Sequence, residues 1–518
     1  MKNYIITGAS LLALAIATPA FAQSTGSVSD IDQGGTGNGA TVTQTGSNNS
    51  DVDQDGTNNS ATVDQTGTGA VSGVDQTGTG NIAKTTQESL GGLADVIQNG
   101  NTNNSTITQD DDNAGGTTGT VPEDPEAFVN QQGNLNTSTI GQTNASSSLN
   151  LVAVVNQSLD GNISAVTQAA SGTGAGDLVA SVTQSSGATS TINQTAIGNN
   201  SVNQDAIVNQ TGANSSNISQ TFNTNGSNTF LATVTQTNSS NVSTITQEDK
   251  GSGIDSGLTA MVLQDGFDND VTINQDNKGA TATVTQSGDT NDAFVDQDGS
   301  GLSVNILQQG DSNLADVSQM GGLNSSVDID QLGDSSFAYV NQDSNARNDT
   351  AIVLQQIGST NNVATIDQNG TATVPSSPSF STAEIVQTAT ATNGDATIRQ
   401  NGTRNLALTT QSNDNNSSII TQNGTGTTAL TANDAETTQS GNDNVSKLTQ
   451  TGNTNEADLL QMGDGNTSDV AQTGNGNISD ILQDGSSNDA LVMQTSDNNV
   501  SNITQSGTGG SVTVTQGN

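Results

Sequence analysis

Residues 450–494 read QTGNTNEADLL, QMGDGNTSDVA, QTGNGNISDIL, QDGSSNDALVM and a closing Q, so a glutamine opens every block of eleven residues. The interval persists without interruption as far as Gln516, and a second run with the same interval begins at Gln264. A fixed period of this length is stronger evidence for the fold than the local secondary-structure propensities of the residues. The glutamines that mark it are Gln264, Gln275, Gln286, Gln297, Gln308, Gln319, Gln450, Gln461, Gln472, Gln483, Gln494, Gln505 and Gln516.

Each block repeats other residue types around its glutamine. A branched aliphatic residue stands two positions before it, as Val470 and Val492 do, and alanine or serine stands four before. Glycine follows two positions later and asparagine five later, which gives the unit N-x-[AS]-x-[VI]-x-Q-x-G-x-x. The repeated positions that we assign to turns are Gly452, Gly463, Gly474, Gly485, Asn466, Asn477 and Asn488.

The period fits a strand better than a helix. An 11-residue repeat also suits a right-handed coiled coil, at 3.67 residues per turn. Here, however, the small, branched and glutamine positions step by two, which is the side-chain period of a strand. Glycine, asparagine and serine would also destabilise a helix. We therefore predict one strand and one turn per unit, with glycine and asparagine in the turn because they adopt positive φ most easily.

One such strand cannot bury its inner face alone. Two strands folded against each other form a coil of about 22 residues, and coils stack at about 4.8 Å. The predicted fold class is therefore all-β, a parallel β-solenoid of 11-residue strand–turn units. Stacking places glutamine on glutamine, whose amides can hydrogen-bond in a ladder and so avoid the cost of an unpaired buried group. Residues 490–494 are expected to stack on residues 468–472, with Val492 on Val470.

The first residues have the features of an export signal. Lys2 precedes an apolar stretch, and Ala20-Phe21-Ala22 forms a signal-peptidase site, so residues 1–22 are predicted to be a cleaved signal peptide. A membrane anchor is the alternative, but the stretch is short for one. We expect no membrane span after cleavage. Residues 23–518 are predicted to form one repeat solenoid, with proline-containing extruded loops near 110–126 and 371–381.

Composition excludes several classes of function. The chain of 518 residues has 51 Asp and Glu against 8 Lys and Arg, a formal net charge of −43, and no His, Cys or Trp. Catalysis by Ser–His–Asp or Cys–His, and metal sites with His or Cys ligands, are therefore impossible. Eight cations are too few for a nucleic-acid surface. We expect no enzyme activity, no cofactor and no nucleic-acid partner.

Three more specific kinds of site are partly compatible with the sequence. The acidic turn at residues 265–270 has oxygen ligands suited to calcium, but it lacks the spacing of known calcium loops, so a solvated turn is the simpler interpretation. Thr-x-Thr pairs such as Thr41 and Thr43 suggest an ice-binding plane, but aspartate occupies many equivalent positions. Paired carboxylates could hydrolyse sugars, yet no pair is distinguished from the others.

The repeat resembles the curlin repeat of bacterial curli fibres, S-x5-Q-x-G-x-x-N-x-[AS]-x3-Q. Residues 308–319, 450–461 and 483–494 carry this pattern, and the chain would be an unusually long member of that family. The resemblance implies a subunit of extracellular amyloid fibres that serve in adhesion and biofilm matrix. It also implies secretion through the periplasm to the cell surface, passage through an outer-membrane pore, and seeding by a nucleator subunit.

Two functional hypotheses share this fold. In the first, the chain self-associates into fibres; in the second, it is a monomeric secreted adhesin or matrix protein. Residues 510–516 form a complete strand pattern, and an open strand edge invites pairing, which favours fibres. The large negative charge opposes close approach of copies, which favours the monomer. The sequence leaves both hypotheses open.

Overall fold

A computed structural model describes residues 26–88, 91–111, 125–145, 149–172, 176–198, 202–223, 228–249, 257–343, 346–370, 379–425 and 432–517. These described residues form forty β-strands and no helix. The predicted signal peptide lies outside them, as do residues 112–124 and 371–378 of the predicted loops. The chain divides into two compact units, one comprising Met1–Phe230 with Ser252–Ile254 and the other Leu231–Gly251 with Asp255–Asn518.

The first unit contains sixteen strands. Its odd-numbered strands are β1 (Val28–Thr36), β3 (Asn49–Thr57), β5 (Val71–Thr79), β7 (Leu93–Asn101), β9 (Glu126–Gln132), β11 (Leu149–Ser158), β13 (Gly176–Ser185) and β15 (Val202–Thr211). Its even-numbered strands are β2 (Gly39–Thr45), β4 (Ser60–Thr66), β6 (Ile82–Glu88), β8 (Asn104–Asp111), β10 (Thr137–Asn144), β12 (Ile163–Gly172), β14 (Thr189–Gly198) and β16 (Ser215–Phe222). Strands β8 and β9 thus occupy the two margins of the loop predicted near 110–126.

The second unit contains the remaining strands, including most of β17. Its odd-numbered strands are β17 (Asn228–Ser239), β19 (Leu258–Phe267), β21 (Thr281–Ser287), β23 (Ser303–Gln309), β25 (Ser326–Gln331), β27 (Thr350–Gln355), β29 (Thr382–Gln387), β31 (Leu406–Ser412), β33 (Asp434–Ser440), β35 (Glu456–Met462), β37 (Ile478–Ser486) and β39 (Val500–Thr508). Its even-numbered strands are β18 (Val242–Asp249), β20 (Asp270–Lys278), β22 (Asp292–Ser300), β24 (Leu314–Leu323), β26 (Phe337–Gln342), β28 (Val363–Asn369), β30 (Asp395–Thr403), β32 (Ser417–Thr425), β34 (Val445–Thr451), β36 (Thr467–Thr473), β38 (Asp489–Gln494) and β40 (Ser511–Gln516).

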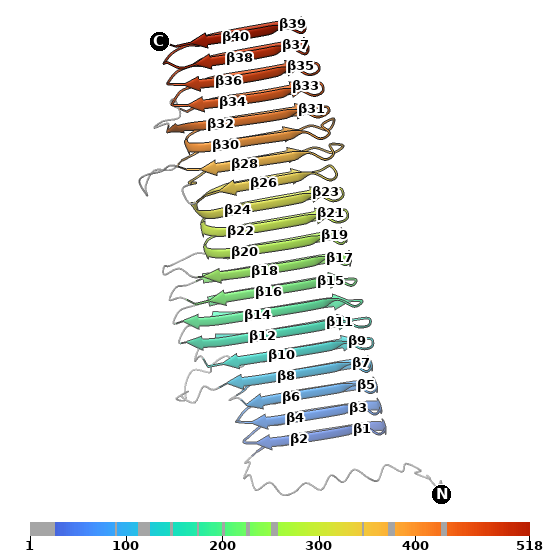
Figure 1. The fold of residues 1–518 in the computed structure, drawn as a ribbon. Coiled ribbons are helices and arrows are strands. Elements are labelled where there is room, and N and C mark those ends of the chain that lie inside the picture. Colours follow the sequence, from blue (N-terminus) through green and yellow to red (C-terminus); the bar gives the residue numbers. More distant parts are fainter. Residues whose placement is uncertain are drawn as a thin grey trace, which may run out of the picture. The chain divides into compact units, whose positions relative to one another are not determined.

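Within each unit, a strand pairs in parallel with the next strand but one. The odd-numbered strands form one sheet and the even-numbered strands a second, so one coil consists of one strand from each. Figure 1 shows β34, β36, β38 and β40 as successive parallel rungs. Val470 pairs with Val492 and Gln472 with Gln494. The predicted stacking of residues 490–494 on 468–472, and the parallel β-solenoid itself, are confirmed.

Coil length varies while the strand register does not. Stacked glutamines are 22 residues apart in the regular stretches, as between Gln472 and Gln494, but 33 apart between Gln98 and Gln131. The mean is about 24 residues per coil, slightly above the predicted 22 because insertions between strands lengthen some coils. Each insertion lies in a connection, so the glutamines on either side remain in register.

Alternate side chains of each strand point into the coil. In β36, Ser468, Val470 and Gln472 are buried, whereas Thr467 and Thr473 are exposed. Burying a valine or isoleucine side chain contributes roughly 1.5–3 kcal/mol, and the column at this position is almost entirely Val, Ile or Leu. The core is therefore a narrow layer of small, branched and glutamine side chains between two sheets.

The turn glycines are required by backbone geometry. Gly463, Gly474 and Gly485 have φ values of 98°, 114° and 131°, in a region that other residues rarely adopt. Gly463 and Gly485 also lie directly under the glycine of the adjacent coil: a Cβ added to Gly485 would be 1.9 Å from the carbonyl oxygen of Gly507. The glycine column thus allows consecutive turns to stack at strand spacing.

We predict that Gly485→Ala destabilises the fold by about 1–3 kcal/mol, because it combines an unfavourable φ with a clash against backbone. Gly39→Ala is the matched control, since Gly39 starts β2 and a Cβ there would meet nothing within 4 Å. Chemical denaturation followed by circular dichroism measures both variants. Equal midpoints for the two would show that the glycine stack is not a constraint.

Candidate functional site: the buried amide ladders

The glutamine side chains hydrogen-bond from coil to coil. The Nε2 of Gln483 donates to the Oε1 of Gln505 at 3.0 Å, and the Oε1 of Gln483 accepts from the Nε2 of Gln461 at 2.9 Å. The second hydrogen of the Gln483 amide is donated to the carbonyl of Thr467, in the opposite sheet, at 2.9 Å. Each amide therefore joins its own sheet along the stack and holds the two sheets together across the coil.

The same arrangement recurs in both glutamine runs. Within the runs that start at Gln264 and Gln439, the distances from Nε2 to Oε1 lie between 2.8 and 3.0 Å. The donor always belongs to the earlier coil, so all the amide dipoles of a ladder point the same way. Aligned hydrogen bonds polarise one another and are stronger together than singly.

Asparagine forms a second ladder, in a role that differs from the predicted one. Asn466, Asn477 and Asn488 do not have positive φ; the residues before them, Gly465, Gly476 and Ser487, do. The asparagine side chains are buried instead. The Nδ2 of Asn466 donates to the turn carbonyl of Gly485 at 2.9 Å, and its Oδ1 accepts the backbone amide of Asn488 at 3.1 Å.

The reason for this correction is the polar backbone of the turn. A buried carbonyl or amide must be paired, and the asparagine carboxamide provides one acceptor and two donors for that purpose. Asparagine therefore recurs because its side chain satisfies the turn of the neighbouring coil. Positive φ is supplied by its neighbour.

One coil replaces the asparagine with an aspartate. Asp349 precedes β27 in the asparagine column and is buried, and the backbone amide of Ser381 donates to its Oδ1 at 2.6 Å. Burial is the largest of the effects that raise the pKa of the Asp349 carboxyl to about 6, and the charge of Asp343 acts in the same direction. Hydrogen bonds from the Ser379 hydroxyl and from the amides of Ser381 and Arg347 act in the opposite direction. The site carries a buried charge above this pH.

The outward faces carry carboxylates in register. Asp32, Asp53 and Asp75 are directly paired on β1, β3 and β5. Partial burial raises the pKa of Asp75, and the charges of Asp53 and Asp51 add to the effect. No odd-numbered strand contains lysine or arginine within the residues that the structure describes. The described strands of this face therefore supply no cation to pair with its carboxylates.

Some outward positions are apolar, which the repeat pattern did not predict. Met261 and Leu263 in β19 are 45% and 44% exposed, and Leu460 and Leu482 line a groove on β35 and β37. The signal was present in the sequence, because Leu stands directly before Gln264, Gln461 and Gln483. An average over all units hides it, since most units have Thr, Asp or Asn at that position.

The described ranges contain no helix long and apolar enough to cross a membrane. In the same ranges, no three His, Cys, Asp or Glu side chains are grouped so that they could hold a metal ion. The acidic turn at residues 265–270 instead uses its carboxylate in hydrogen bonds, with the Oδ1 of Asp265 accepting from Thr237 at 2.6 Å and from Asn238 at 2.9 Å.

Two-stranded coils, a parallel register and continuous side-chain ladders define a β-solenoid repeat protein. Three segments of the chain, residues 280–310, 310–343 and 452–485, match the family model of the curlin associated repeat. These three segments therefore carry curlin repeats, and the repeats together with the β-solenoid fold point to a structural or adhesive protein. No curated protein matches it in sequence.

The ladder predicts which side of a strand determines stability. Gln483→Ala leaves Gln461, Gln505 and the carbonyl of Thr467 each short of a partner, so we expect a loss of about 1–3 kcal/mol. Asp480→Ala, on the outward side of the same strand, should be neutral or slightly stabilising. Denaturation midpoints measure both, and equal losses would contradict the assigned inner and outer faces.

Asp349 predicts a pH dependence of stability. Because its folded pKa is raised to about 6, its stabilising contribution is complete below the unfolded value and is lost as pH rises through about 6. Asp349→Asn restores the ladder amide and should remove this dependence, with a gain of about 3 kcal/mol at pH 8. Denaturation at pH 4 to 8 is the measurement. Asp64→Asn, the same substitution at an outward position of β4, is the control and should not reproduce the gain in stability at pH 8.

Proposed function

We propose that the chain is a structural subunit of extracellular curli-like amyloid fibres that serve in adhesion and biofilm matrix. In this proposal the chain is exported to the cell surface, with a secretion pore and a nucleator subunit as partners. The observation that carries the proposal is the match between the coil of β1 and β2 and the coil of β39 and β40. Among the described residues, each of these coils leaves one edge of its strands unpaired. The inward side chains exposed at the edge of one coil match those of the other.

The matching begins with the inward residues. Strand β1 reads VSDIDQGGT and β39 reads VSNITQSGT, so serine, isoleucine, glutamine and glycine recur at the same positions. Ile31 in β1 is 44% exposed, whereas Val52 in the next coil is fully buried. A second copy whose β39 pairs with β1 would cover Ile31 with Ile503. This is the contact that every internal coil already makes.

The amide ladders match as well. Gln505 and Gln516 lie eleven residues apart, and so do Gln33 and Gln44, so both ladders align in one docking register. The amide Nε2 of Gln516 donates one hydrogen, to the carbonyl of Val500, and has a second to offer. The Oε1 of Gln44 is the acceptor that the directed ladder would place opposite it. The docking is therefore head to tail, and such contacts propagate into filaments.

Charge controls the approach of two copies without blocking the contact itself. In the proposed register, Asp30 and Asp32 of β1 face Asn502 and Thr504 of β39, so no carboxylate opposes another. The formal net charge of −43 still repels a second chain at longer range. Salt screens that repulsion within a Debye length of about 8 Å at physiological ionic strength. Protonation of the carboxylates abolishes it.

Assembly should therefore accelerate as the charge is reduced. We expect a soluble lag phase in neutral low-salt buffer, and faster fibre growth on acidification towards pH 4 or on addition of salt. Partial burial raises the pKa of Asp75 and Asp95, so their protonation begins above the ordinary range. Electron microscopy and a thioflavin time course across pH 4–8 at two ionic strengths provide the test.

A matched pair of variants tests the docking register. Gln516→Glu keeps the acceptor for Gln494 but cannot donate to the next copy, so growth should slow about tenfold or more. Thr513→Glu adds the same charge to the exposed side of β40 and should slow growth much less. Equal effects would attribute the change to charge alone. A chain that remains monomeric at low pH and high salt would support the monomeric adhesin instead.

A further inference from the structure

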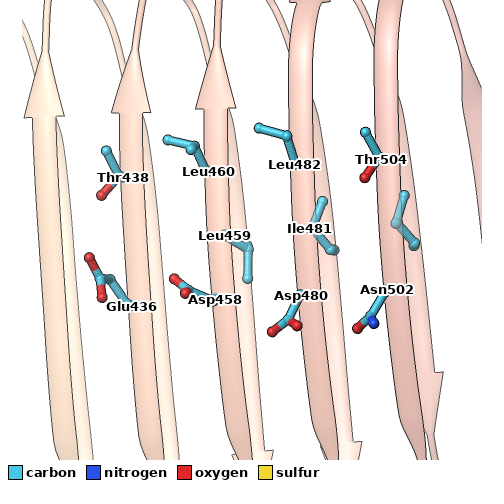
Figure 2. A pocket seen from close by; sticks show the side chains of 11 residues that line it. Glu436, Thr438, Asp458, Leu459, Leu460, Asp480, Ile481, Leu482, Asn502 and Thr504 are labelled. Atoms are coloured by element: carbon cyan, nitrogen blue, oxygen red, sulfur yellow. The ribbon is translucent and has the colours of Figure 1, made fainter.

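A groove crosses the outward face of the odd-numbered sheet in the second unit. It lies over β33, β35, β37 and β39 and has a volume of about 490 Å³. Figure 2 shows two rows of side chains along it, one containing Glu436, Asp458 and Asp480 and the other containing Leu460 and Leu482. One wall is thus anionic and the other aliphatic, and both run across the strands.

The parallel register sets the repeat of both walls. Glu436 pairs directly with Asp458, and Asp458 with Asp480; Leu460 pairs with Leu482 in the same way. Carboxylates therefore recur at the strand spacing of about 4.8 Å along the groove. The leucines lie two residues further along each strand, about 7 Å to one side. A ligand along the groove would meet a negative charge at each strand and an apolar surface beside it.

The carboxylates of this groove repel one another. Partial burial raises the pKa of Glu436, with added effect from Asp458 and Asp434. Partial burial likewise raises the pKa of Asp458, with added effect from Asp480. The acidic row ends at Asn502. The Nδ2 of Asn502, with its amide oriented so that the nitrogen faces the acceptors, donates to the Oδ2 of Asp480 at 3.2 Å. The described odd-numbered strands include no lysine or arginine to offset this charge.

We propose that this groove binds a linear alkylpolyamine, a flexible chain of protonated amines separated by short runs of methylene groups. Two amines joined by three methylenes are about 5 Å apart when extended, from four bonds of about 1.5 Å at near-tetrahedral angles. That distance matches the strand spacing of about 4.8 Å, and a four-methylene link, about 6 Å when extended, shortens towards the same spacing with one gauche torsion. Three successive amines can therefore face Glu436, Asp458 and Asp480, while the methylenes cover Leu460 and Leu482. All the residues of this site belong to one copy of the chain, so binding does not require fibres.

The aliphatic wall distinguishes the groove from the acidic row of β1, β3 and β5. Asp32, Asp53 and Asp75 repeat at the same spacing on β1, β3 and β5. Two residues earlier on those strands stand Asp30, Asp51 and Gly73, so no apolar wall accompanies that row. A polyamine held only by charge would bind both rows. A polyamine held by both charge and alkyl contact binds the groove more tightly than that row. This preference persists at physiological salt, because salt screens charges but not apolar contacts.

The test is isothermal titration calorimetry of the full-length soluble protein with spermine, spermidine and putrescine at physiological salt and neutral pH. We expect putrescine to bind most weakly, because its two amines reach only two of the three carboxylates, whereas spermidine and spermine reach all three. The double variant Leu460→Thr and Leu482→Thr keeps every charge and places at both sites the residue already found at Thr438 and Thr504. It should weaken spermine binding about tenfold, through loss of apolar contact.

Two further variants separate the groove from general charge. Asp458→Asn should weaken spermine binding about tenfold, whereas Asp53→Asn, the central residue of the control row, should change it less than twofold. Circular dichroism verifies the fold of each variant. The proposal is overturned if the leucine variant binds spermine as tightly as the parent. It is also overturned if calcium displaces spermine at equal concentration, since an ion that cannot touch the leucines would then be bound as well.

Discussion

The hydrogen bond between stacked glutamine amides is the interaction on which this structure depends. Its geometry requires that equivalent glutamines be one strand spacing apart, which fixes the register of every pair of strands in a ladder. A slip of one residue would turn the glutamines outward and bury the outward carboxylates without partners, at a prohibitive cost. The valine and alanine columns contribute free energy through burial. The amides select the register, because an apolar side chain can pack against many neighbours whereas a directed hydrogen bond forms with few.

This constraint leaves the connections free. The separation of stacked glutamines rises from 22 residues between Gln76 and Gln98 to 33 between Gln98 and Gln131, with Nε2–Oε1 distances of 2.8 Å in both. Loop closure costs little more for a longer loop, so insertions are tolerated wherever they project from a turn. The turns themselves are limited only where glycine stacks on glycine and where asparagine closes the neighbouring turn.

Sequence alone predicted the solenoid and its inner face because both follow from spacing. The stacking of Val470 on Val492 is a direct consequence of an 11-residue period and two strands per coil. The burial of Asn466 did not follow, because the same residue type suits a positive-φ turn and an inward amide, and only the neighbour's φ decides between them. Asp349 and the groove leucines were missed for another reason. They are departures from the average unit, and their effect depends on what lies in the coil above.

The inward and outward faces of a strand are therefore subject to different constraints. Inward residues must match the coil on either side, and the coil of β39 and β40 retains the inward pattern of β1 and β2 except that Val512 stands at the position of Ala40. Outward residues have no such requirement, and here they differ between the sheets: the described lysines and arginines that lie in strands, such as Lys84, Arg399 and Lys447, are all in even-numbered strands. A protein built in this way can keep the interior needed for stacking while its odd and even faces diverge in charge and polarity. Binding chemistry on those faces can then arise without a cleft, from rows of side chains that the ladder holds at a constant spacing.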